Sequence, residues 1–127
     1  MSYIMGYYSK VAVALRKADF ADLQKSYDVF CRANAGNPEV TSDLFTDCIK
    51  RTASDGRVVL YWSGIKWYDD YPEVKFFMDF IRDLDHMDFL RCGEEPDDIE
   101  EIGNSEYGAP FYPEVALIFN GLKEKAA

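Results

Sequence analysis

Apolar and polar residues alternate near the start of the chain in the way that a strand requires. Across residues 7–16, Val11, Val13 and Leu15 stand at odd positions and Lys10 at an even one. A period of two places the apolar side chains on one face of a sheet. The segment is therefore predicted to be a half-buried strand.

Two later segments repeat apolar residues at helical spacing. We expect Asp19 to cap the first helix, and Gly36 and Pro38 to end it. Its apolar stripe consists of Phe20, Leu23, Tyr27, Phe30 and Cys31. The second helix is predicted to begin at Pro72, because proline is favoured at the first helical position. Its stripe consists of Val74, Phe77, Met78, Ile81 and Leu84.

Residues 43–53 fit either a short helix or a strand. Asp55 and Gly56 follow them, and this dipeptide is a strong signal for a hairpin turn. The β-branched and aromatic run at 58–66 is the clearest strand in the chain. We therefore favour a strand that pairs with 58–66 through the turn.

The rest of the pattern predicts short strands at 87–92, 99–102 and 111–119. The resulting order indicates an α+β fold of the ferredoxin-like, split β-α-β kind. It would have an antiparallel sheet, two helices on one face and extra C-terminal strands. The length and the absence of a linker composition favour a single domain over residues 1–127.

The net charge of −9 is concentrated in one stretch of the chain. Residues 69–106 hold fourteen Asp and Glu against three Lys and Arg, whereas residues 1–68 hold seven against nine. Direct binding to nucleic acid is not expected, because that interaction depends on Lys and Arg. With no leader and no apolar run of about 18 residues, we expect a cytoplasmic protein without a membrane partner. Cys31, Cys48 and Cys92 match no disulfide or metal pattern and are interpreted as buried free thiols.

Four blocks of sequence resemble a known family. They are Met5-Gly6-Tyr7-Tyr8-Ser9, Leu60-Tyr61-Trp62-x-x-Ile65-Lys66-Trp67-Tyr68, Tyr71-Pro72-Glu73-Val74 and Arg91-x-Gly93-Glu94-x-x-Asp97-Asp98-Ile99-Glu100-Glu101-x-Gly103. The family consists of small acidic proteins of tailed bacteriophages and prophages that have no established activity. The resemblance implies a phage accessory protein in the cytoplasm of a bacterial host, and it carries over no functional residue.

The densest charge lies at residues 94–101, where six of eight positions are carboxylates. They are Glu94, Glu95, Asp97, Asp98, Glu100 and Glu101. One interpretation is a solvated surface. Another is a patch that imitates nucleic acid and docks on a basic groove. A divalent metal site is a third, disfavoured because the spacing lacks the pattern of an EF-hand loop. The sequence indicates no metal and no cofactor.

A second candidate is an aromatic cluster next to two further carboxylates. Five rings fall within eleven positions, more than one strand face can bury. We expect core packing for Tyr61 or Trp62, and recognition for the group Trp67, Tyr68, Asp69, Asp70 and Tyr71.

These features favour binding over catalysis. The first hypothesis is inhibition of a host or defence protein, such as a nuclease or CRISPR effector, through the acidic and aromatic residues. The alternative is a sponge for a nucleotide or second messenger that uses the rings and Lys66. An enzyme is not expected, because no catalytic motif is present and His86, the only histidine, has no evident partner. A homodimer is left open.

Overall fold

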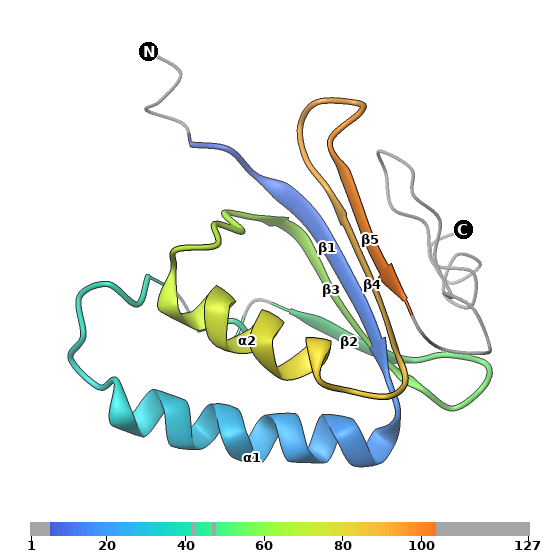
Figure 1. Cartoon of the computed structure of the whole chain (residues 1–127), viewed down its shortest axis with the longest axis horizontal. Coiled ribbons are helices and arrows are strands. Elements are labelled where there is room, and N and C mark those ends of the chain that lie inside the picture. Colours follow the sequence, from blue (N-terminus) through green and yellow to red (C-terminus); the bar gives the residue numbers. More distant parts are fainter. Residues whose placement is uncertain (1–5, 42, 47, 104–127) are drawn as a thin grey trace.

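The computed structural model describes residues 6–41, 43–46 and 48–103. Within them the chain forms two helices and five strands (Figure 1). In order they are β1 (Ser9–Leu15), α1 (Lys17–Ala33), β2 (Ile49–Thr52), β3 (Val58–Ile65), α2 (Pro72–Arg82), β4 (Met87–Cys92) and β5 (Ile99–Gly103). The predicted strand at 111–119 lies outside the described residues.

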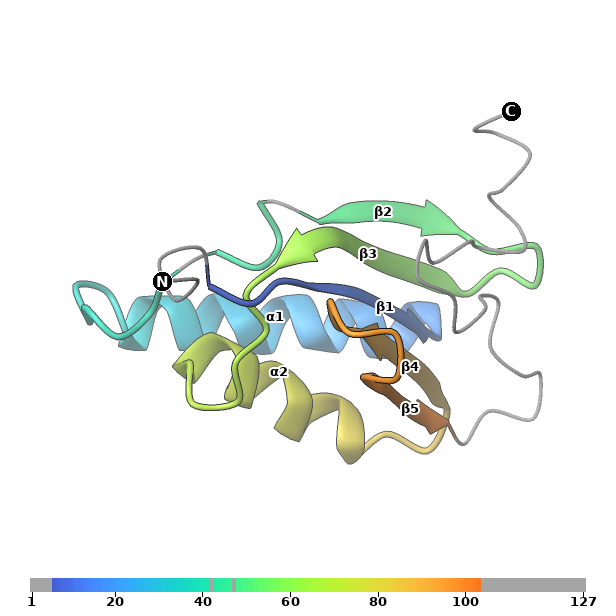
Figure 2. The same ribbon diagram turned by 90° about the horizontal axis from the view of Figure 1, so that it is seen from above.

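The strands form one open sheet in the order β2-β3-β1-β4-β5. Every neighbouring pair is antiparallel. Seen from above, β1 runs between β3 and β4 (Figure 2), and both helices pack on the same face of the sheet. The prediction of an α+β fold with an antiparallel sheet and two helices on one face is therefore confirmed.

The central strand is buried on both faces, so the prediction of a half-buried strand is wrong. Val11, Val13 and Leu15 face the helices and join the main core. Ala12 and Ala14 are also fully buried, on the opposite face. There they belong to a second apolar layer with Ala53, Val59, Leu90 and Cys92. A strand flanked on both edges and covered on both faces reads as a continuous apolar run.

Helix α1 starts two residues before the predicted cap. Arg16 is the N-cap residue, and it makes no side-chain capping bond. Asp19 lies in the first turn instead, where its carboxylate accepts a hydrogen bond from Arg16 Nε at 2.9 Å. An acidic residue in the first turn also interacts favourably with the helix dipole. Helix α2 begins at Pro72 as predicted.

The hairpin between β2 and β3 confirms the strand interpretation of residues 43–53 in part. Only Ile49–Thr52 is extended and paired with β3, while residues 44–46 form a turn. Gly56 adopts φ +90° in the hairpin turn, a conformation that glycine reaches without strain.

The free thiols are not all buried. Cys92 is buried, as expected, but Cys31 is exposed and Cys48 is half-buried. Cys31 lies near the C-terminal end of α1, after the buried residues of its stripe.

Candidate functional site

Segments that are distant in sequence meet where β1 begins and where β3 and β4 end. In Figure 1 the start of β1 and the β4–β5 connection lie at the same end of the sheet. The antiparallel pairing requires this, because Lys10 at the start of β1 pairs with Cys92 at the end of β4. We call residues 6–9, 66–71 and 91–101 the acidic end.

Asp98 is the centre of the acidic end. Arg91 Nη2 donates to Asp98 Oδ1 at 2.8 Å, and Arg91 Nη1 donates to Asp98 Oδ2 at 3.2 Å. The Tyr7 hydroxyl donates to the same Oδ2 at 2.6 Å. The hydrogen bonds from Arg91, then that from Tyr7, lower the pKa of Asp98 to about 2. Asp98 is therefore ionised at neutral pH, and both of its oxygens accept hydrogen bonds from residues of the same chain.

The same arginine binds a second carboxylate on the next strand. Arg91 Nε donates to Glu100 Oε1 at 3.1 Å, and Arg91 Nη1 also donates to the hydroxyl of Ser9 at 3.2 Å. Asp98 and Glu100 together raise the pKa of Arg91. One half-buried guanidinium thus binds the acidic loop, β5 and the start of β1 together.

The acidic loop is fastened to the N-terminal segment at two further points. The amide of Tyr8 donates to Glu94 Oε2 at 2.7 Å, and the amide of Glu95 donates to the Tyr7 hydroxyl at 3.1 Å. Gly93 makes this approach possible, since a Cβ there would collide with the Asp98 carboxylate and the Tyr7 hydroxyl. Glycine at this position serves close packing rather than a turn, since a larger residue would displace these two side chains.

The six predicted carboxylates therefore divide into two groups of three. Glu94, Asp98 and Glu100 make the contacts above. The exposed side chains of Glu95, Asp97 and Glu101 have no ion pair or side-chain hydrogen bond with any residue that the structure describes. Asp69 and Asp70 are exposed in the same way. These five carboxylates are the ones available to a partner.

The structure corrects the role expected of Trp67. Its side chain is only 7% exposed and packs in the main core, with ring centroids 5.2 Å from Trp62 and 5.5 Å from Phe77. Trp62 is buried, as expected, and donates its indole N–H to the carbonyl of Leu44 at 2.7 Å. Trp67 cannot contact a partner or stack on a nucleotide without unfolding of the core.

Tyr68 and Tyr71 lie at the surface, and part of each side chain is already in contact with other residues of the chain. Both are half-buried, and their ring centroids are 5.0 Å apart. The Tyr68 hydroxyl accepts a hydrogen bond from the Tyr7 amide at 2.7 Å. The structure thus brings the predicted aromatic and acidic groups together, and residues 7 and 8 are the link between them.

Sequence reasoning missed Tyr7, Tyr8 and Arg91 as parts of the site. Tyr8 is 43% exposed, and it lines a pocket of about 190 Å³ together with Gly64 and Glu94. A signal existed, because the blocks that carried the phage resemblance contain all three residues. Positions in the sequence alone could not predict that Tyr7 and Tyr8 lie close to Arg91 in space.

Other kinds of site find no support in the part of the chain that the structure describes. No group of three or more His, Cys, Asp or Glu side chains there is placed to hold a metal ion. No helix there is long and apolar enough to cross a membrane. Comparison with known proteins finds no matching family model, no similar curated protein and no similar solved structure.

Proposed function

We propose that the chain binds a basic surface of another protein through its acidic end. The observation that carries the proposal is the division of the carboxylates. Asp98 and Glu100 bind Arg91 and thereby hold the loop in place. Glu95 and Asp97 stay exposed on this loop. A loop whose backbone is held in place before binding loses little conformational entropy when a partner arrives.

The surface around these charges suits a protein partner better than a small ligand. Tyr8 is exposed next to a shallow pocket, and exposed tyrosines are common anchors in interfaces. The local excess of carboxylates would steer a basic partner into contact and would repel phosphate groups. A groove that normally binds nucleic acid has the complementary charge.

The phage resemblance supports a biological setting for this binding. We propose an accessory protein of the bacterial cytoplasm that inhibits a host or defence protein, a CRISPR effector or nuclease being the most concrete case. We also propose that the fold is ferredoxin-like. The position of β1 between β3 and β4 and the single helical face support this, with β5 added at one edge.

The test is charge reversal at the carboxylates that make no contact within the molecule. Glu95→Lys with Asp97→Lys is compared with Asp22→Lys and Glu39→Lys, which change the net charge equally at exposed positions on α1 and in the following loop. Binding to a fluorescent deca-arginine peptide should weaken about tenfold for the first pair and less than about twofold for the second. Each variant is also used to capture proteins from a lysate of the bacterial host.

The two readouts separate a local site from a general effect of charge. A protein captured by the wild type and by the Asp22→Lys, Glu39→Lys variant, but not by the Glu95→Lys, Asp97→Lys variant, would identify the partner. Equal weakening of peptide binding in both variants, with an unchanged set of captured proteins, would show that the acidic end only contributes solubility.

A further inference from the structure

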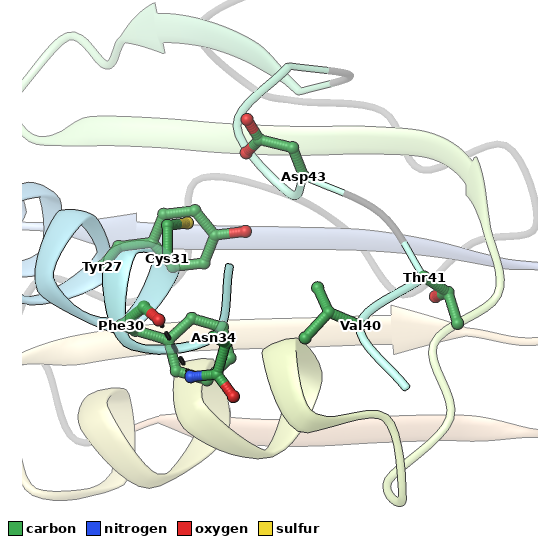
Figure 3. Close-up of a pocket in the computed structure, with 7 residues that line it drawn as sticks. All are labelled: Tyr27, Phe30, Cys31, Asn34, Val40, Thr41 and Asp43. Atoms are coloured by element: carbon green, nitrogen blue, oxygen red, sulfur yellow. Dashed lines mark hydrogen bonds between the residues drawn. The ribbon is translucent and has the colours of Figure 1, made fainter. Parts of the chain in front are cut away.

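A second pocket lies away from the residues of the acidic end. It has a volume of about 250 Å³ and is lined by the C-terminal half of α1, by Asn34 that follows it, and by Val40, Thr41 and Asp43. Figure 3 shows Tyr27, Phe30 and Cys31 on the helix, opposite Val40 and Asp43 on the following segment. None of its lining residues takes part in the hydrogen bonds of the acidic end.

The helical wall of this pocket is aromatic and rigid. Tyr27 is only 5% exposed, and its hydroxyl accepts a hydrogen bond from the Leu44 amide at 2.9 Å. The rings of Tyr27 and Phe30 stack with centroids 5.8 Å apart, and Phe30 stacks on Phe76 at 4.9 Å. The wall is thus held from behind by packing and exists before any ligand binds.

Most polar groups at the rim are already used. Asn34 Nδ2 donates to the carbonyl of Phe30 at 2.8 Å, and Asn34 Oδ1 accepts from Asn37 Nδ2 at 3.1 Å. The Thr41 hydroxyl donates to Glu73 Oε2 at 2.8 Å. These contacts close the rim and leave Asp43 as the group that can select a ligand.

Among the described residues that line the pocket, Asp43 is the only charged one. One of its oxygens accepts a hydrogen bond from the Phe45 amide at 3.1 Å, and its side chain is exposed. Its negative charge acts on the opposite wall. Burial first, and the charge of Asp43 in addition, raise the pKa of Cys31, so the thiol stays neutral at physiological pH. The described lining contains no Lys or Arg that could receive an anion.

We propose that this pocket binds a small cationic ligand with a single ring, the ring against the half-buried Phe30 and the cation at Asp43. The volume, slightly below the roughly 300–1,000 Å³ of pockets for drug-sized ligands, suits one ring rather than a nucleotide. Aromatic faces attract a cation as well as a ring. Phosphate and carboxylate ligands are disfavoured by the charge of Asp43.

The test uses three probes that share a ring and differ in charge. Benzylamine, benzyl alcohol and benzoate are titrated into the full chain labelled with ¹⁵N, and amide shifts are followed by NMR. Benzylamine should produce saturable shifts confined to residues 27–45, with an affinity above that of benzyl alcohol and well above that of benzoate. Benzoate binding as tightly as benzylamine would overturn the proposal, and so would shifts centred on another surface.

Two variants and a control make the assignment specific. Asp43→Asn keeps the oxygen that binds Phe45 and should weaken benzylamine about two- to fivefold, with benzyl alcohol unchanged. Cys31→Trp places a large side chain into the pocket from an exposed helical position and should abolish the shifts for both probes. Asp22→Asn, exposed on the same helix and outside the pocket, should change neither affinity. Retained benzylamine binding in Cys31→Trp, with the fold intact by circular dichroism, would contradict the site.

Discussion

Two arginines bind carboxylates at opposite ends of the sheet, and they differ in their exposure to water. Arg57, before β3, pairs with Asp88 at 2.7 Å and Asp55 at 2.8 Å, and the side chains of Arg57 and Asp88 are only 7% and 8% exposed. Arg91, on β4, is 17% exposed, while its partners Asp98 and Glu100 are 33% and 38% exposed.

The difference in exposure separates a structural role from one open to binding. Arg57 and Asp88 neutralise each other inside the protein, while Asp55, 31% exposed, binds Arg57 from the surface. Removal of Asp88 therefore leaves Arg57 with fewer partners in a poorly hydrated place. Around Arg91 the same chemistry fixes a loop at the surface, and the carboxylates that it does not use point to solvent. The exposed carboxylates beside the Arg91 network are therefore the charges that we assign to binding another molecule.

The largest effect is expected from breaking the buried pair. Asp88→Ala removes the buried one of the two carboxylates that bind Arg57 and leaves Asp55 in place. It should lower the free energy of unfolding by about 1.5–3 kcal/mol, measured by urea denaturation. Asp97→Ala is the matched control at the exposed end, and it should change stability by less than about 0.5 kcal/mol. A loss below about 1 kcal/mol for Asp88→Ala would mean that water reaches Arg57 and that the contrast between the two ends is false.

A smaller effect, dependent on pH, is expected from the exposed network. The pKa of Asp98 is about 2 in the folded chain, below its ordinary value of 3.8. A carboxylate with a lowered pKa stabilises the fold above its unfolded pKa, and this contribution is lost as the pH falls through the folded value. With allowance for solvent screening it amounts to about 1 kcal/mol, lost between about pH 4 and pH 2.

The variant Asp98→Asn tests this contribution. It keeps an oxygen that can accept from Tyr7 and removes the charge that binds Arg91. The free energy of unfolding is measured by urea denaturation from pH 2 to pH 7. At neutral pH it should be about 1 kcal/mol lower in Asp98→Asn than in the wild type. Between pH 4 and pH 2 it should change less with pH in the variant than in the wild type. An unchanged slope in that range would show that other carboxylates determine the acid sensitivity.

The sequence predicted most of the fold because its signals are local. The apolar stripe after Pro72 and the turn at Asp55 and Gly56 depend only on neighbouring residues, and both led to the observed elements. The two-sided burial of β1 depends on which strands flank it. Pairing with β3 and β4 brings together residues more than 40 positions apart, and the local pattern of apolar residues does not predict such pairing.

The site was predicted less well, for the same reason. Asp98 looked like one of several equivalent charges, and its distinction comes from Tyr7, 91 positions earlier. Trp67 was expected at the surface because one strand face cannot bury five rings. It lies beyond the end of β3, and its ring turns back onto Phe77 of α2 in the core. Counting rings along the chain could not anticipate that change of direction.

The smallest effect is expected from Tyr7, whose hydroxyl joins Asp98 to the amide of Glu95. Tyr7→Phe leaves every charge in place and removes only these two hydrogen bonds. Global stability should change less than in Asp98→Asn, and hydrogen exchange at the Glu95 amide should become faster because that donor loses its acceptor. Tyr8→Phe, whose hydroxyl makes no hydrogen bond to the described residues, is the control and should leave the exchange unchanged. If Tyr7→Phe also weakens binding to deca-arginine, the fixed arrangement of the loop contributes to binding, since the net charge is the same. Unaltered exchange at Glu95 would instead assign the ordering of the loop to Arg91 alone.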